Sequence, residues 1–197
     1  MIGPTTSFIE TGPLRFRTLT WGQGSETVLF LHGLSGVAEV WGPTVDHLPA
    51  TRRYVAIDQR GHGQSAAPAA GYTASDMVSD AASVIEQLGE RVHLAGHSMG
   101  ARIALVLAAR LPHLLRSVAI IDIGPEASKA NIENTVRGIG TRPERFESRG
   151  EALEFAFRKR QSTPADEAVF LARLSPHSDG SFTWRASREA LAACVTE

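Results

Sequence analysis

Ser98 is the residue of this chain best placed to do chemistry. It stands at the centre of Gly96-His97-Ser98-Met99-Gly100, between an apolar run at 92–95 and a helix-forming run at 101–109. A strand that turns sharply into a helix lifts a serine hydroxyl above a sheet and points the helix N-terminus at it. Glycine is needed on both sides because Cβ atoms there would collide with neighbouring backbone. The spacing therefore predicts a nucleophilic serine at the tip of a strand-to-helix turn.

Two backbone N–H groups are candidates for binding an oxyanion beside this serine. The segment His32-Gly33-Leu34 follows another apolar run at 27–31, and Gly33 permits a tight turn that leaves the next amide free. The N–H groups of Leu34 and Met99 are the candidate pair, and the helix dipole favours the second. One such donor is typically worth about 3 kcal/mol in a transition state. The alternative is that residues 32–36 form a plain loop.

Asp122 is the candidate acid of this site. It directly follows the apolar run at 118–121, which comes after the run that leads to Ser98. If both runs are parallel strands, their carboxyl ends lie at one edge of the sheet and Asp122 lies near Ser98. The alternative role is structural, with the carboxylate accepting hydrogen bonds from loop amides that hold the turn.

A glycine-rich loop with paired charges follows the apolar run at 54–57. It reads Asp58-Gln59-Arg60-Gly61-His62-Gly63-Gln64-Ser65. We expect Asp58 and Arg60 to brace neighbouring loops through charge-assisted hydrogen bonds rather than to contact a substrate. We expect His62 to be a solvated loop residue.

The segments that carry these motifs predict a mostly parallel sheet with an antiparallel hairpin at its N-terminal edge. The hairpin is indicated by alternating polarity over 7–11 and 14–21. The apolar runs are too continuous for strands with one wet face, so we expect them to be buried on both faces. They lie at 27–31, 54–57, 92–95 and 118–121.

Helices are expected between these strands, on both faces of the sheet. The longest begins at the capping-box pair Thr73 and Asp76 and ends at Gly89. Because crossovers between parallel strands are right-handed, we expect the helices to alternate over the sheet and the strand ends to share one edge.

Residues 126–197 lack the strand pattern of residues 1–125. We expect helices at 130–137, at 150–160 and from 163 to 173, then a short extended piece and a last helix. The apolar residues of this region are too few for an independent core. We therefore predict a helical cap that packs over the sheet edge of the N-terminal core.

Composition favours a small molecule as the partner of this chain. The 197 residues are 43% hydrophobic, with 20 basic and 21 acidic residues and a net charge of −1. The sequence has no long run of like charges, which argues against a nucleic-acid or anionic-membrane surface. It also has no pair of residues at a spacing typical of metal ligands. A single cysteine, Cys194, and an N-terminus without a signal-peptide pattern lead us to expect a cytoplasmic protein.

The order of three motifs resembles the α/β-hydrolase fold family, in particular its small esterase-like branch. The motifs are His32-Gly33, Asp58-x-Arg60-Gly61-x-Gly63-x-Ser65 and Gly96-His97-Ser98-Met99-Gly100. The resemblance covers residues 7–125. It implies an eight-stranded sheet with a helical cap after the sixth strand, no cofactor, and a triad in the chain order serine, acid, histidine.

The activity we expect is that of a serine hydrolase that cleaves a small carboxylic ester or a related acyl compound through an acyl-enzyme on Ser98. Two alternatives stay open. One is a carbon-carbon bond hydrolase or a perhydrolase on the same scaffold. The other is a non-catalytic ligand-binding protein that keeps the pocket without the chemistry.

The histidine of the implied triad has no match in this sequence. In the family it follows the last strand, whereas His177 is the only histidine on the predicted cap and is expected to be a solvated turn residue. We expect the last two strands and the base to lie beyond residue 197. The alternative is a truncated protein with part of the site. Either way, an unactivated serine is a poor nucleophile, so we expect the 197-residue chain to be nearly inactive.

Overall fold

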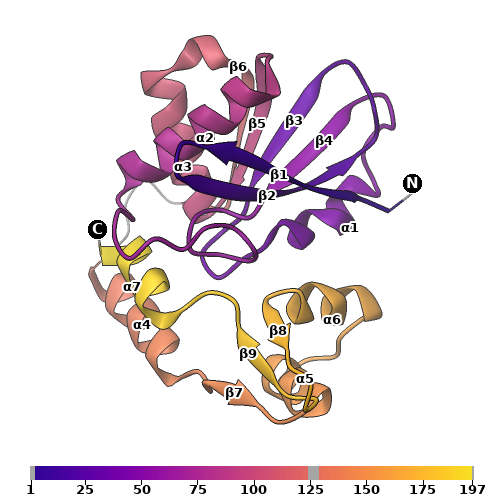
Figure 1. Ribbon diagram of the computed structural model, residues 1–197, viewed down its shortest axis with the longest axis vertical. Coiled ribbons are helices and arrows are strands. Elements are labelled where there is room, and N and C mark those ends of the chain that lie inside the picture. Colours follow the sequence, from indigo (N-terminus) through magenta and orange to yellow (C-terminus); the bar gives the residue numbers. More distant parts are fainter. Residues whose placement is uncertain (1–2, 124–128, 197) are drawn as a thin grey trace.

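The computed structural model describes residues 3–123 and 129–196 and contains a six-stranded sheet at its centre (Figure 1). The strand order is β1-β2-β4-β3-β5-β6. The strands are β1 (Thr5–Thr11), β2 (Leu14–Trp21), β3 (Thr27–Leu31), β4 (Arg53–Ile57), β5 (Val92–His97) and β6 (Leu115–Ile121).

The predicted hairpin and parallel sheet are confirmed. β1 and β2 pair antiparallel around a turn that places Thr11 opposite Leu14, and β2 pairs antiparallel with β4. β4, β3, β5 and β6 are mutually parallel. The four parallel strands therefore end at one edge of the sheet, and the loops that carry Leu34, Ser98 and Asp122 leave from that edge.

Helices connect the parallel strands. A 3-10 helix (Ala38–Trp41) and α1 (Gly42–Val45) follow β3, α2 (Ala74–Leu88) follows β4, and α3 (Met99–Arg110) follows β5, before a 3-10 turn (Pro112–Leu114). The predicted capping box is present: Thr73 accepts from the Asp76 N–H, and the Asp76 carboxylate accepts from Thr73. Gly89 ends α2 at a φ of 73°, where glycine alone carries no penalty.

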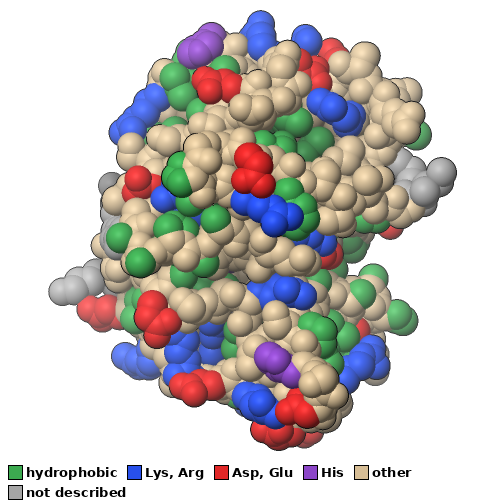
Figure 2. Space-filling view, viewed as in Figure 1, with side chains coloured by type: hydrophobic (Ala, Val, Ile, Leu, Met, Phe, Trp, Pro, Cys, Tyr) green, Lys and Arg blue, Asp and Glu red, His purple; other side chains and the backbone are tan. Residues whose placement is uncertain are grey.

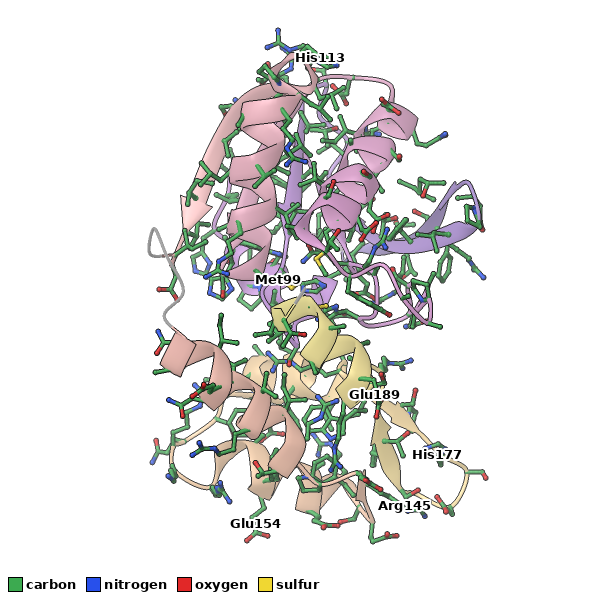
Figure 3. All side chains as sticks on the ribbon, turned by 90° about the vertical axis from the view of Figure 1, so that its left-hand side faces the viewer. Met99, His113, Arg145, Glu154, His177 and Glu189 are labelled. Carbon is green, nitrogen blue, oxygen red and sulfur yellow. The ribbon has the colours of Figure 1, made fainter. Side chains whose placement is uncertain are left out.

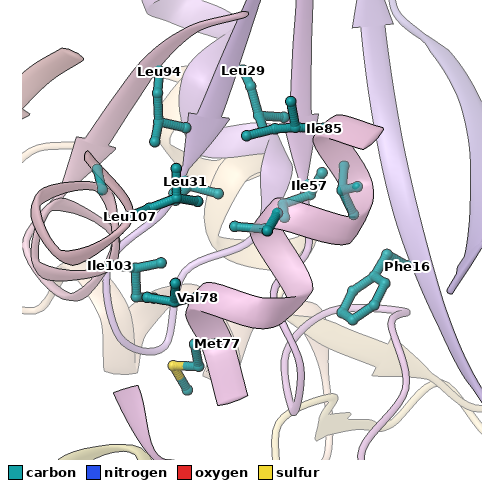
Figure 4. Packing of buried hydrophobic residues seen from close by; sticks show 14 of the residues in the cluster. Phe16, Leu29, Leu31, Ile57, Met77, Val78, Ile85, Leu94, Ile103 and Leu107 are labelled. Carbon is teal, nitrogen blue, oxygen red and sulfur yellow. The ribbon is translucent and has the colours of Figure 1, made fainter. Parts of the chain in front are cut away.

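The expectation that the helices alternate over the sheet is wrong, because α2 and α3 share one face. Leu29 and Leu31 of β3 pack there against Ile85 of α2 and Ile103 of α3 (Figure 4). The chain runs from β3 out to β4 and then back over β3 to β5 and β6. It reverses direction once, so right-handed crossovers put both later helices on the same side.

The opposite face of the sheet has a smaller aromatic core. Phe30 stacks on Trp41 with ring centroids 4.6 Å apart and lies 6.1 Å from Tyr54. The short helical segments after β3 cover this face.

β6 departs from the prediction that all four apolar runs are buried on both faces. Most of its residues are exposed, including Ile120 and Ile121 at 42% and 40%. The physical reason is position: β6 is the outer strand of the described sheet and pairs with β5 alone.

Residues 129–196 form a cap beside the carboxyl edge of the sheet (Figure 1). It comprises α4 (Lys129–Thr141), β7 (Arg145–Phe146), α5 (Arg149–Phe157), α6 (Pro164–Leu171), β8 (Leu174–Pro176), β9 (Phe182–Trp184) and α7 (Arg188–Thr196). The predicted helices are present. The expected short extended piece contains β9, but the pairing of three short strands in the antiparallel order β7-β9-β8 was not predicted.

The cap also has a core of its own, contrary to expectation. Phe146 is fully buried between Phe155 and Trp184, at centroid distances of 5.4 and 5.7 Å, and Phe170 meets Trp184 edge-on at 5.8 Å. Few apolar residues are needed because each aromatic side chain buries roughly 150–250 Å².

The surface of the described chain carries mixed charge. On the face shown in Figure 2, acidic and basic side chains are interspersed over both the core and the cap. In the described parts of the chain, no helix is both long enough and apolar enough to cross a bilayer.

Replacing Phe146 by Ala is expected to destabilise the cap by about 3–5 kcal/mol, because a buried aromatic ring is lost from a small core. Native-state hydrogen exchange should show loss of protection in α5 and β9 while β3 and β5 keep theirs. Phe8→Ala is the control, since Phe8 is 37% exposed and its loss should cost less than about 1 kcal/mol. Equal loss of protection in core and cap would contradict a separate cap core.

Candidate active site

Ser98 occupies a sharp turn between β5 and α3, as the sequence predicts. Its backbone has φ 51° and ψ −113°, outside the regions that side chains normally allow. Its N–H donates to the carbonyl oxygen of Ile121 on β6 at 3.0 Å. The next residue, Met99, already belongs to α3. The turn is therefore fixed between a strand end, a neighbouring strand and a helix start.

Close backbone approach explains the glycines around this turn. A Cβ on Gly96 would collide with the Gly100 carbonyl, and a Cβ on Gly100 would collide with the Leu31 carbonyl. A Cβ on Gly33 would lie 3.2 Å from the Ser98 Cβ and 2.8 Å from His97 Nδ1. The collisions predicted at Gly96 and Gly100 are confirmed, and they come from backbone atoms that cannot move aside.

Ser98 faces a cavity of about 890 Å³ between the core and the cap. Core residues of the lining include Leu34, Met99 and Asp122. Among the described residues, the non-glycine positions with positive φ are Ser35, Ser98 and Asp122, and all three line this cavity. Backbone strain of this kind concentrates where a structure is held for function.

The two candidate oxyanion donors lie at the same cavity. The tight turn predicted at Gly33 is present, since the Gly36 N–H donates to the Gly33 carbonyl at 2.9 Å. No described residue accepts a hydrogen bond from the N–H of Leu34 or of Met99. Met99 is the first residue of α3, whose N-terminus carries a partial positive charge. Neither amide therefore has an acceptor within the part of the chain that the structure describes.

Asp122 lies beside the Ser98 turn but in an open position. Its Oδ2 is 3.5 Å from His97 Nε2, and the two side chains are 85% and 41% exposed. Within residues 3–123 and 129–196, no loop amide donates to the Asp122 carboxylate. The structural role considered for Asp122 is therefore not seen among the described residues, and its contact is with an imidazole.

The loop after β4 is a brace, as expected. The Asp58 carboxylate is fully buried and accepts from the Ala38 N–H at 2.7 Å, the Gln64 N–H at 2.9 Å and Arg17 at 3.2 Å. Arg60 holds α2 through Asp80, with Nη2 2.6 Å from Oδ1. These ion pairs fix the loops that surround the cavity without facing it.

His62 is buried, so the expectation of a solvated loop histidine is wrong. Its Nδ1 donates to the Arg60 carbonyl at 2.9 Å, and its Nε2 accepts from the Ser35 N–H at 3.2 Å. His32 is held in the same way: Nδ1 donates to the Gly33 carbonyl at 2.8 Å and Nε2 accepts from the Gln59 N–H at 3.0 Å. The burial of these histidines could not be predicted from the sequence, because one hydrogen-bond partner of each lies on a loop 27 residues away.

Both histidines are neutral. Burial lowers the pKa of His32 to about 4 and that of His62 to about 3. Protonation would also turn each Nε2 acceptor into a donor that faces a backbone N–H. Neither imidazole is therefore poised to act as a general base.

His177 and two cap arginines are the remaining candidate residues of the site. His177 lies at the far end of the cap (Figure 3), where it is exposed and its Nε2 lies 2.9 Å from the Thr183 hydroxyl. Arg142 and Arg173 line the cavity, and no sequence motif marks them. Within the described ranges, no three His, Cys, Asp or Glu side chains gather to hold a metal ion.

Comparison with known proteins assigns the family. Residues 26–191 match the family described as alpha/beta hydrolase fold. The chain belongs to the α/β-hydrolase fold family. Among solved structures, the chain is similar to E-2-(acetamidomethylene)succinate hydrolase, with a TM-score of 0.87 and 29% identity over 98% of this chain and 72% of that one.

Curated relatives are similar to this chain over somewhat more than half of its length. The 2-(acetamidomethylene)succinate hydrolase of Mesorhizobium japonicum is 39% identical over 119 residues, which are 59% of this chain and 42% of that protein. A dihydrolipoyllysine-residue acetyltransferase component of the acetoin cleaving system of Cupriavidus necator is 38% identical over 116 residues, 58% of this chain and 31% of that protein. The matched stretch thus spans less than half of either relative.

The two buried histidines predict how the stability of this chain depends on pH. Unfolded histidine binds a proton below about pH 6.5, whereas folded His32 and His62 do so only near pH 4 and pH 3. The unfolding free energy should therefore fall as the pH drops from 7 to 5.5, by up to about 1.4 kcal/mol per pH unit for each histidine. Urea titrations at several pH values measure this slope.

The control for this prediction is the exposed His113. His62→Gln should reduce the slope, and His113→Gln should leave it unchanged. A slope that His62→Gln does not alter would contradict the burial of His62 as a neutral acceptor.

Proposed function

We propose that this chain carries the nucleophile of a serine hydrolase, which cleaves a small carboxylic ester or a related acyl compound through an acyl-enzyme. The observation that carries the proposal is that Ser98, in a strained left-handed turn, and two amides without an acceptor among the described residues meet at one cavity. Strain and unpaired donors both cost stability, so their coincidence is typical of a site arranged for chemistry.

In the proposed reaction, Ser98 Oγ attacks the carbonyl carbon and the carbonyl electron pair moves to oxygen. The Leu34 and Met99 amides hold this oxyanion, and the helix dipole of α3 adds to the second. Collapse of the intermediate expels the leaving group, which takes the proton that the base received from Ser98. Water then hydrolyses the acyl-enzyme by the same steps, and the serine is regenerated.

We propose that the base is a histidine beyond residue 197 and that Asp122 is the acid that orients it. Support comes from the environment of the described imidazoles: both ring nitrogens of His32 and His62 are already bonded to backbone groups. His97 is the in-chain alternative, because it precedes Ser98 and lies 3.5 Å from Asp122. Labelling of Ser98 by a fluorophosphonate separates a base beyond residue 197 from His97.

The names of relatives support an acyl substrate in a broad sense. Relatives of the matched region are named as a 2-(acetamidomethylene)succinate hydrolase and as a putative carbamate hydrolase of Pantoea ananatis, the latter 40% identical over 101 residues, 50% of this chain and 36% of that protein. Amides and carbamates share with esters a carbonyl that a serine can attack. We propose that this carbonyl is the group that reacts at Ser98.

Reaction with a fluorophosphonate probe, followed by intact mass, tests the nucleophile. The longer protein that the proposal expects should gain one adduct, on Ser98, and Ser98→Ala should gain none. Ser35→Ala is the matched control, because Ser35 also has a positive φ and lines the same cavity. This variant keeps Ser98 and should label at the normal rate. The 197-residue chain should label about 100-fold or more slowly, the typical contribution of a general base.

Two other labelling results would contradict parts of the proposal. Equal labelling of the 197-residue chain would contradict a base beyond residue 197, and loss of that labelling in His97→Ala would identify the in-chain base. No labelling of either protein would overturn the nucleophile and favour a non-catalytic ligand-binding protein.

A further inference from the structure

Two arginines on the cap side of the cavity have no carboxylate partner. Arg142 directly follows α4 and is 8% exposed, and Arg173 lies between α6 and β8. Both line the cavity that Ser98 faces. Among the described residues, neither guanidinium forms an ion pair, whereas the buried Arg17 and Arg60 do so with Asp58 and Asp80 respectively. The cap arginines are therefore exceptions within this chain.

Their hydrogen bonds are also incomplete. Arg142 donates from Nη2 to the Ala186 carbonyl at 2.6 Å and lies over the Trp184 ring at 4.5 Å, but its Nε is buried without an acceptor. The Nε of Arg173 is likewise buried without an acceptor, and no described residue accepts any hydrogen bond from this side chain. Arg142 is thus held in place while its Nε–H stays without an acceptor, and Arg173 is held by packing without a side-chain hydrogen bond to any described residue.

The charge of the two guanidiniums acts on two buried histidines in the loops beside the cavity. Burial lowers the pKa of both arginines, and Arg188 lowers that of Arg142 further, against a smaller opposite effect of Glu189. The charge of Arg173 contributes to the lowered pKa of His32, and that of Arg142 to the lowered pKa of His62. Both cations therefore act on the loops that carry Leu34 and Ser35.

The lining of the cavity is positive overall. Its charged side chains among the described residues are Arg102, Arg142, Arg173 and Asp122. Asp122 is largely exposed and lies against His97, so it does not neutralise the cap arginines. An unpaired, desolvated cation is costly, and the cost falls when an anion binds to it. A guanidinium offers a planar pair of donors that fits a carboxylate.

We propose that Arg142 and Arg173 form an anion subsite and that the substrate carries a carboxylate which binds there while its carbonyl reacts at Ser98. The second half of this inference rests on the proposed function, and the subsite itself does not. Phe155 and Trp184 also line the cavity and would contact the carbon chain between the two groups. The substrate class is therefore an acyl compound with a second, free carboxylate.

Binding of succinate tests the subsite without any reaction. Binding of succinate is followed by NMR through the indole N–H signal of Trp184. Succinamide serves as the neutral analogue of the same shape. Succinate should shift this signal in a saturable way, and added salt should weaken its binding. Succinamide should bind at least about tenfold more weakly, because it lacks the charge that the arginines recognise.

Arg173→Met separates recognition from structure. Succinate should bind about 10- to 100-fold more weakly to this variant, as expected for loss of a charge-assisted hydrogen bond. The thermal midpoint should stay equal or rise, because a half-buried guanidinium whose buried Nε has no acceptor is replaced by an apolar chain. Arg137→Met is the matched control, since Arg137 is exposed on α4 and does not line the cavity; both binding and midpoint should be unchanged.

Three results would overturn the subsite: equal binding of succinate and succinamide, unchanged binding in Arg173→Met, or a lowered midpoint of Arg173→Met with the loss of binding explained by unfolding. Ser98→Ala should bind succinate as the wild type does. Succinate binding together with absent probe labelling would keep the subsite and reject the proposed chemistry. Probe labelling of Ser98 without succinate binding would keep the proposed chemistry and reject the subsite.

Discussion

The site depends on one constraint: three segments of backbone approach each other at Ser98 more closely than side chains allow. Gly96 and Gly100 face each other across the turn, and Gly100 also meets the carbonyl at the end of β3. Gly33 meets the Ser98 side chain from the other side. With these contacts in place, the chain passes from β5 into α3 with Ser98 at a positive φ of 51°. The strain is maintained because the sheet and the helix on both sides are well packed.

The rest of the molecule supports this turn from two directions. Below it, a buried polar layer of Asp58, His32 and His62 ties the loops after β3 and β4 to each other through backbone N–H groups. Above it, the aromatic core of the cap carries Arg142 and Arg173 to the opposite wall of the cavity. The result is a strained nucleophile candidate and two free amides on one side, and uncompensated positive charge on the other.

Local signals made much of this predictable from the sequence. The glycines around Ser98, the alternation of the hairpin and the capping box at Thr73 each specify a structure within a few residues. What failed depends on strand order or on distant contacts. The shared face of α2 and α3 follows from the position of β3 between β4 and β5. The cap strands are only two or three residues long, too short for a periodic pattern.

The most direct test compares the stabilities of Ser98→Gly and Ser98→Ala by chemical denaturation. In ordinary helix or strand backbone, glycine is less stable than alanine by roughly 0.5–1 kcal/mol. At φ 51° and ψ −113° the order should reverse, with Ser98→Gly more stable than Ser98→Ala by about 1 kcal/mol, because glycine relieves the strain. If Ser98→Ala is equally stable or more stable, the turn is not strained and the account of how the chain presents Ser98 is wrong.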